Sequence, residues 1–242
     1  MPELTAAHKA WIAEQIFANE CNLKTRCLTS WNEGEDFPSL GIGHFIWFRA
    51  GQQEPYLESF PALIRFYQAR GHAIPDWLRQ LPALDSPWQT RSEFLADLDN
   101  ERLRTLRSFL LETQSIQADF ILARLHDTLP QLQAASHRPE AIETLFYQLA
   151  QSHPPHGMYA LIDYVNFKGE GTSDQERYQG QGWGLLQVLE YMLDHPGNNS
   201  LLQHFSDSAR AILARRIANA PPERRESRWT AGWNRRVAGY QP

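Results

Sequence analysis

The sequence contains only two cysteines, Cys21 and Cys27, among its 242 residues. They are separated by five residues, a spacing that fits no common zinc-binding pattern, and no Cys/His cluster accompanies them. We therefore expect no metal site and no cofactor. We favour two partly buried thiols. A disulfide between them is the alternative, and it would indicate an exported protein.

The sequence also lacks a long apolar run. No stretch approaches the roughly 20 residues that a membrane-spanning helix needs, so we expect no membrane span. The first residues, MPELTAAHKAWIAEQ, have no basic segment followed by an apolar one and show no signal peptide. We expect either a cytoplasmic protein, or a periplasmic or secreted one whose leader was removed before this numbering begins.

Positive charge is scarce, because 23 basic residues face 28 acidic ones and give a formal net charge of −5. Nucleic-acid binding requires a basic face, so we expect no nucleic-acid partner. The content of 42% hydrophobic and 12% aromatic residues is ample for a core, and 21% charged residues argue against disorder.

Most of the chain has the 3.6-residue periodicity of helices. A capping box, Thr90 to Glu93, predicts the start of a long helix. Residues 28–48 are rich in turn residues and predict a small β-hairpin region, and residues 168–182 form a glycine-rich loop. The fold class is therefore α+β and predominantly α-helical. We expect helices at about 5–19, 56–70, 90–112, 115–134, 140–151, 156–167, 183–195, 200–219 and 222–240.

Glu20 closes the first predicted helix, one turn after Ile16 and Phe17. An acidic cluster, Glu33 to Asp36, then precedes the turn Gly41-Ile42-Gly43-His44. A carboxylic acid at a helix end, facing an extended segment with a second acid, is typical of glycosidases. The alternative for Glu20 is a solvated surface glutamate.

Residues 10–48 resemble phage-type lysozymes, in which a catalytic glutamate ends the first helix and a Gly-Ile-Gly-His turn follows a hairpin with a second acid. The resemblance implies a hydroxyl residue near the catalytic water at Ser39, and a structural histidine at His44. It implies Glu20 as the general acid and Glu33 as its partner, with Glu35 and Asp36 as further candidates for the partner. Residues 231–236 are similar to a Gly-x-x-x-Arg-Arg segment of phage endolysins, and we expect this basic, aromatic C-terminus to pack against the remainder.

A second motif lies at residues 166–187, where glycines alternate with side chains that bind sugars. Its part 184–188 resembles the Gly-Leu-Met-Gln segment of goose-type lysozymes and lytic transglycosylases, which makes Glu170 the competing acid. We favour Glu20 as the acid and the loop as the part that holds substrate. A purely structural connector is the alternative. The expected substrate contacts are Ser39, Glu170, Tyr178 and Gln181, with Trp31, Trp47 and Trp183 stacking on sugar rings.

The sequence thus predicts one lysozyme-like domain over residues 1–242 with helical insertions. The expected function is cleavage of glycosidic bonds, as a lysozyme-like hydrolase or a lytic transglycosylase, in peptidoglycan or a related amino-sugar polymer. The negative charge also suits a cationic polymer such as chitosan. The alternatives are a non-catalytic carbohydrate-binding or scaffold protein with this fold, or an unrelated helical interaction protein. The oligomeric state stays open.

Overall fold

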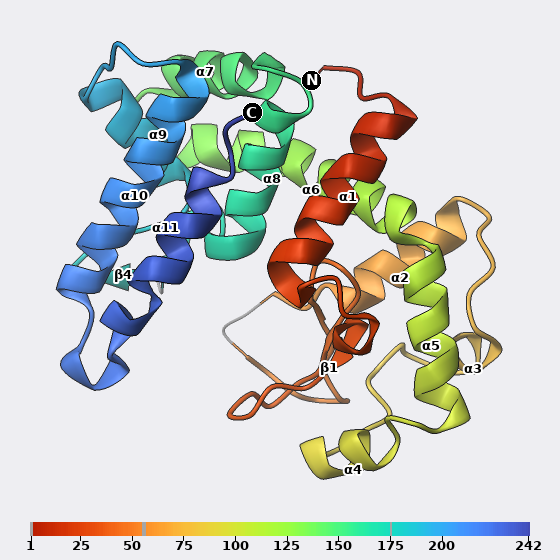
Figure 1. Ribbon diagram of the computed structural model, residues 1–242. Helices are drawn as coiled ribbons and strands as arrows, with labels where there is room; N and C mark the ends of the chain where they lie inside the picture. Colours follow the sequence, from red (N-terminus) through yellow and green to blue (C-terminus); the bar gives the residue numbers. More distant parts are fainter. Residues whose placement is uncertain (1, 55–56, 175) are drawn as a thin grey trace. The chain divides into compact units, whose positions relative to one another are not determined.

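The computed structural model describes residues 2–54, 57–174 and 176–242 (Figure 1). Helices dominate it and a small antiparallel sheet is present, which confirms the predominantly helical class. Contacts divide the chain into two compact units, unit 1 with Met1–His8 and Leu122–Pro242, and unit 2 with Lys9–Ile121. The boundaries fall inside helix α1 (Ala6–Cys21) and inside helix α6 (Gln114–Ala135). A single lysozyme-like domain stays a prediction.

Unit 2 carries the predicted hairpin region. A three-stranded antiparallel sheet of order β1-β2-β3 pairs Ser30 with Ser39 and Leu40 with Phe45. Its elements are most of α1 (Ala6–Cys21), η1 (Thr25–Leu28), β1 (Thr29–Ser30), β2 (Ser39–Leu40), β3 (Phe45–Ile46), α2 (Phe60–Ala69), α3 (Asp76–Arg79), α4 (Arg91–Ala96) and α5 (Glu101–Glu112), followed by the first turns of α6.

Helix α1 buries Ile12, Ile16 and Phe17 on one face. It ends where Asn22 and Leu23 take positive φ angles of 49° and 58°. The Leu23 N–H donates to the Phe17 carbonyl at 3.5 Å, so a carbonyl of the last turn finds a partner after the helix has stopped. This ending places Glu20 in the last turn of α1.

The predicted long helix from residue 90 to 112 is wrong, because it is broken into α4 and α5. Thr90 does cap α4 by accepting the Glu93 N–H at 3.2 Å. The Asp97 carboxylate, however, accepts from the Trp88 indole at 2.9 Å and from the Asn100 amide at 2.6 Å. Asp and Asn side chains that bond locally offer the backbone an alternative to helix, and they interrupt it here.

Unit 1 is built from helices around a short hairpin. Helix α10 packs against both α9 and α11, as Figure 1 shows, and α8 is buried over most of its length. The elements after α6 are α7 (Pro139–Gln151), α8 (His156–Lys168), β4 (Arg177–Tyr178), β5 (Gln181–Gly182), α9 (Leu185–Asp194), α10 (Leu201–Asn219), η2 (Pro222–Arg224), η3 (Glu226–Trp229) and α11 (Thr230–Ala238). Among the described residues, no helix is both long and apolar enough to cross a membrane.

A buried ionic network fastens the C-terminus of unit 1. Asp163 in α8 is fully buried and accepts two bonds from the Arg236 guanidinium, each 2.8 Å, and one from the Tyr240 hydroxyl at 2.7 Å. Burial and the neighbouring carboxylate raise the pKa of Tyr240 well above its ordinary value, so its hydroxyl keeps the proton that it donates. Arg236 therefore has a packing role in unit 1, as the sequence predicts for the C-terminal segment.

Replacing Asp163 by Asn should destabilise the protein by about 3–5 kcal/mol, because Arg236 would keep a buried charge without its counterion. The free energy of unfolding in urea measures this. Asp207→Asn is the control, since Asp207 pairs with Arg210 at 2.8 Å on the half-exposed surface of α10. This control should cost about 0–1 kcal/mol. An equal loss in both variants would contradict the buried network.

Candidate functional site

The first cluster surrounds Glu20 at the end of α1. The Glu20 side chain is only 16% exposed, and its Oε2 lies 3.5 Å from Nδ1 of His44. His44 ends the turn between β2 and β3. The Gly-Ile-Gly-His turn thus brings its histidine to the end of the first helix, where the sequence predicts the hairpin to lie.

The turn is held in place by a buried glutamine. Gln117 in α6 is fully buried, accepts the Ile42 N–H at 2.9 Å and donates to the Leu110 carbonyl at 2.6 Å. Gly41 has a φ of +71°, and a Cβ there would lie 2.3 Å from the Gln117 Oε1. Only glycine combines that φ with that close approach at little cost, so the sequence Gly-Ile-Gly fixes the position of His44.

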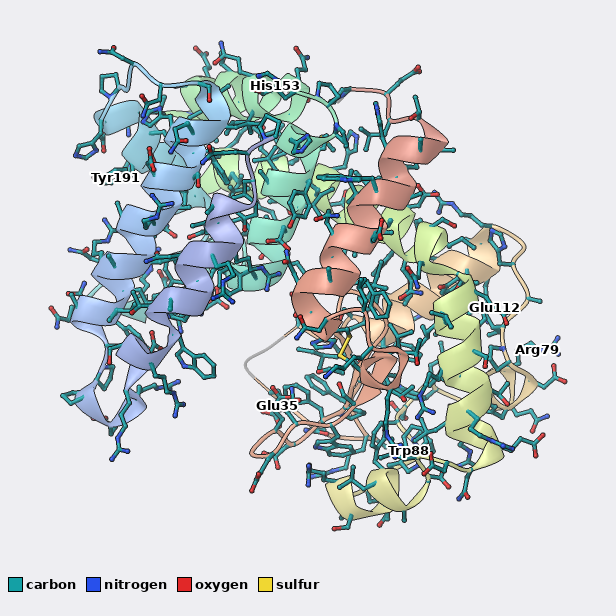
Figure 2. The ribbon with its side chains drawn as sticks, viewed as in Figure 1. Glu35, Arg79, Trp88, Glu112, His153 and Tyr191 are labelled. Atoms are coloured by element: carbon teal, nitrogen blue, oxygen red, sulfur yellow. A yellow bond between two sulfur atoms is a disulfide. The ribbon has the colours of Figure 1, made fainter. Side chains whose placement is uncertain are left out.

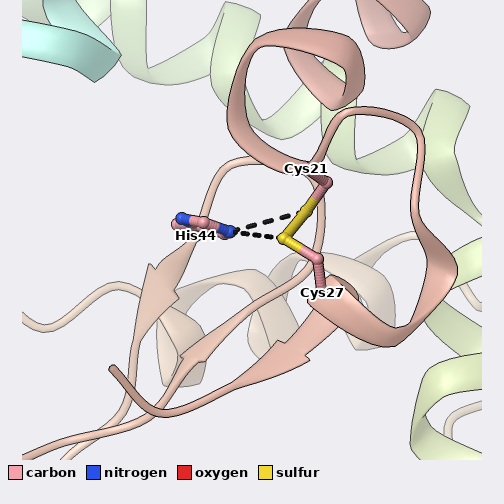
Figure 3. Close-up of side chains that lie close together, drawn as sticks. All are labelled: Cys21, Cys27 and His44. Carbon is pink, nitrogen blue, oxygen red and sulfur yellow. Dashed lines mark hydrogen bonds between the residues drawn. A yellow bond between two sulfur atoms is a disulfide. The ribbon is translucent and has the colours of Figure 1, made fainter. Parts of the chain in front are cut away.

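Cys21 and Cys27 form a disulfide beside this histidine (Figure 3). The favoured prediction of two thiols is therefore wrong, and the alternative is present. Nε2 of His44 lies 3.2 Å from the Cys27 sulfur and 3.5 Å from the Cys21 sulfur. The sequence predicts no metal site, yet the structure brings two sulfurs and an imidazole together from three separate segments.

The other acids predicted in unit 2 lie on the loop between β1 and β2. Glu33 and Asp36 are exposed, and the Glu35 side chain, labelled in Figure 2, accepts from the Asn32 amide at 3.1 Å. Ser39 is buried in β2, where its carbonyl accepts from the Ser30 hydroxyl at 3.2 Å. The exposure of Glu33 suits a solvated carboxylate partner, and its role in catalysis stays a prediction.

Trp31 and Trp47 belong to the core of unit 2. Trp31 is 5% exposed and donates its indole N–H to the Glu35 carbonyl at 2.7 Å. Trp47 is fully buried and packs on Phe60, with ring centroids 4.6 Å apart. Stacking on a sugar requires an exposed ring face, so the burial of these two rings argues against the stacking role that the sequence predicts.

The second cluster lies on the glycine-rich loop of unit 1. Burial, and then the neighbouring Glu170 carboxylate, raise the pKa of Glu176, while Arg216 opposes the shift. A carboxyl group with a raised pKa beside a second carboxyl group is an arrangement that suits acid–base chemistry on a glycoside. The sequence indicates Glu170 but not Glu176, because nothing local to the loop shows that Glu176 is partly buried.

Arg216 of α10 contacts Glu226 in η3 and Trp183 at the end of this loop. It donates to Glu226 at 2.8 and 2.9 Å, and its guanidinium lies 4.0 Å from the centroid of the Trp183 ring. The Tyr178 hydroxyl also donates to Glu226 at 2.9 Å, and its ring packs on Trp183 at 4.6 Å. Burial by itself would raise the pKa of Glu226, but the hydrogen bonds from Arg216 and Tyr178 lower it. Trp183 is only 7% exposed, which again argues against stacking, whereas Gln181 is exposed on β5.

Gln187 closes the loop onto the start of α9. Its side chain accepts the Gly184 N–H and donates to the Gly171 carbonyl, both at 2.9 Å. A Cβ at Gly184 would lie 2.2 Å from the Gly171 nitrogen, so the two glycines permit a direct approach of backbone to backbone. The segment at residues 184–188, which resembles the Gly-Leu-Met-Gln motif, therefore holds the loop that carries Glu170 and Glu176 in place.

An open depression of about 620 Å³ also lies in unit 2. Its wall includes Trp77, Asp97 and Arg102, and none of the predicted site residues lines it. No protein-family model, curated protein or solved structure matches the chain. Function is therefore inferred from the two clusters themselves.

Gly184→Ala should destabilise the protein by about 2–3 kcal/mol, because the new methyl group would collide with backbone atoms of Gly171 that cannot rotate away. Gly232→Ala is the matched control, since a Cβ at this position of α11 meets nothing within 4 Å. The control should be neutral or gain about 0.5–1 kcal/mol from helix propensity. Urea unfolding compares the two, and similar stabilities for both variants would contradict the close approach.

Glu176→Gln should alter the pH dependence of stability. The pKa of Glu176 is raised in the folded protein, so the folded state binds more protons than the unfolded state above the ordinary value of 4.5. The free energy of unfolding of the wild type therefore falls as the pH rises through that window. Glu176→Gln should lose less stability between pH 4 and pH 7 than the wild type, whereas Glu223→Gln, which changes an exposed acid, should follow the wild type. A parallel fall in all three proteins would refute the raised pKa.

Proposed function

We propose that the protein cleaves glycosidic bonds in peptidoglycan or a related amino-sugar polymer, with Glu20 as the general acid. The observation that carries this proposal is the position of Glu20, sheltered in the last turn of α1 with the His44 imidazole 3.5 Å from its carboxylate. A small antiparallel sheet follows the helix after the short 3₁₀ helix η1. This supports the resemblance to lysozymes on which the sequence prediction depends.

In the proposed reaction, the Glu20 carboxyl group donates its proton to the glycosidic oxygen as the bond from that oxygen to the sugar carbon breaks. Positive charge develops on the sugar ring, and a solvated carboxylate, for which Glu33 is the candidate, stabilises it. In hydrolysis, water then adds to the sugar carbon and its proton returns to Glu20. In transglycosylation, a hydroxyl of the sugar adds instead. His44 is a positioning residue, since its Nδ1 holds the carboxylate in one orientation.

The Glu170–Glu176 pair supports a second assignment within the same reaction class. The raised pKa of Glu176 favours the protonated form that a general acid needs, and Glu170 would be the second carboxyl group of the pair. That the loop instead holds substrate for Glu20 stays a prediction. The two assignments differ in which single substitution abolishes cleavage.

Digestion of peptidoglycan and of chitosan, with mass spectrometry of the soluble fragments, tests both assignments. Mass spectrometry detects hydrolytic and transglycosylated ends alike. Glu20→Gln should lower the rate by about 10²–10⁴-fold, because the amide cannot donate the proton. Glu176→Gln and Glu170→Gln should retain most activity if the loop only holds substrate, and Glu223→Gln should match the wild type.

The outcomes separate the proposals. Loss of cleavage only in Glu176→Gln or Glu170→Gln would assign the general acid to the loop of unit 1 instead of Glu20. Wild-type protein that binds either polymer in a pull-down but releases no fragments would favour the non-catalytic carbohydrate-binding protein. Far-ultraviolet circular dichroism of each variant shows that it is folded, so that a loss of rate reports chemistry.

A further inference from the structure

We propose that reduction of the Cys21–Cys27 disulfide converts the surroundings of His44 into a binding site for a thiophilic divalent cation, with Zn²⁺ as the best fit. One ligand atom of each of these three residues lies within 4.8 Å of the others. They come from the end of α1, from η1 and from the turn between β2 and β3. The inference does not depend on glycoside cleavage.

The donor set matches a known class of zinc site. Two thiolates and one imidazole leave a fourth position open for water or another ligand, as in catalytic Cys₂His sites. Thiolates also select zinc over the harder cations that prefer oxygen ligands. Cys21 is buried, Cys27 is half-buried and the His44 side chain is 23% exposed, so the cluster is sheltered but reachable from solvent.

The orientation of His44 is the second observation. Its Nε2 faces both sulfurs, at 3.2 and 3.5 Å, while its Nδ1 faces the Glu20 carboxylate at 3.5 Å. A metal-binding histidine usually donates its other ring N–H to a carboxylate, which fixes the tautomer and the ring orientation. Glu20 is in that position, so the imidazole is already aimed with Nε2 toward the sulfurs.

The backbone at His44 is in an uncommon conformation. His44 has a φ of +47°, in the left-handed region that a residue with a side chain rarely adopts. Figure 3 shows the result, with the edge of the imidazole directed at the disulfide.

The proposed site forms only in the reduced protein. A dithiol reductant transfers two electrons and two protons, becomes a disulfide itself, and leaves two thiols on Cys21 and Cys27. Zn²⁺ then displaces the two thiol protons and binds the thiolates. Because a sulfur in a disulfide is no thiolate, the disulfide and the metal site exclude each other. The disulfide would persist in an oxidising compartment and the metal form in a reducing one.

The segment between the cysteines can accommodate the change. Residues 22–26 are exposed, and Cys27 follows them in a short 3₁₀ helix. The two sulfurs have to separate to bind one cation, and the exposed segment lets Cys27 move without disturbing the buried face of α1.

Titration with Co²⁺ as a spectroscopic substitute for Zn²⁺ tests the proposal. The full-length protein is reduced with a phosphine, which is removed before titration under anaerobic conditions. The reduced wild type should bind one equivalent of Co²⁺ with a thiolate-to-cobalt charge-transfer band, and Zn²⁺ should displace it. The oxidised protein should show no band. His126→Ala is the control, since this exposed histidine of α6 is outside the cluster.

Cys27→Ser and His44→Ala each remove a proposed ligand, so they should abolish the charge-transfer band or weaken cobalt binding by about 10–100-fold. Glu20→Gln should weaken cobalt binding by a similar factor, because it removes the carboxylate that orients His44. Reduced wild type with both thiols alkylated repeats the cysteine test without a substitution. The proposal fails if reduced and oxidised wild type bind cobalt alike. It also fails if alkylation and His44→Ala leave the affinity unchanged.

Discussion

Two buried glutamines hold the two glycine-rich segments on which both candidate sites depend. Gln117 accepts the Ile42 N–H in unit 2, and Gln187 accepts the Gly184 N–H and donates to the Gly171 carbonyl in unit 1. In each case glycines let the loop backbone approach the amide group closely. A buried polar group without its partner costs about 1–3 kcal/mol, so each loop has one favourable position. The side chains of the two candidate sites are positioned by these loops.

In unit 2, this constraint determines which groups the two ring nitrogens of His44 contact. Because the turn is fixed on Gln117, the two ring nitrogens of His44 meet different partners, the Glu20 carboxylate at Nδ1 and the sulfurs of Cys21 and Cys27 at Nε2. The proposed role of Glu20 as an acid and its proposed role in orienting a metal ligand therefore depend on the same contact with His44. Replacing the partner of one ring nitrogen of His44 is therefore expected to alter the contact that the other ring nitrogen makes.

In unit 1, the distribution of hydrogen bonds explains why two glutamates of the same region differ. Nε and one terminal nitrogen of Arg216 both donate to Glu226, and the Tyr178 hydroxyl adds a third bond, so the pKa of Glu226 is lowered in spite of burial. At Glu176, burial and then the charge of Glu170 raise the pKa, and the charge of Arg216 opposes the shift. Direct hydrogen bonds outweigh desolvation at Glu226, whereas desolvation is the largest contribution at Glu176.

The sequence by itself determined the helical class, the extended region at residues 28–48, the cap at Thr90 and the turn that leads to His44, because periodicity, capping and glycine spacing are local properties of a chain. Only the tertiary structure decided that the cysteines are joined, that His44 faces them, and that Glu176 is partly buried. The spacing of Cys21 and Cys27 permits both thiols and a disulfide, and no local pattern relates them to a histidine 17 residues further along the sequence. Burial, pKa and convergence of ligands depend on contacts between distant segments, and these exist only once the chain has folded.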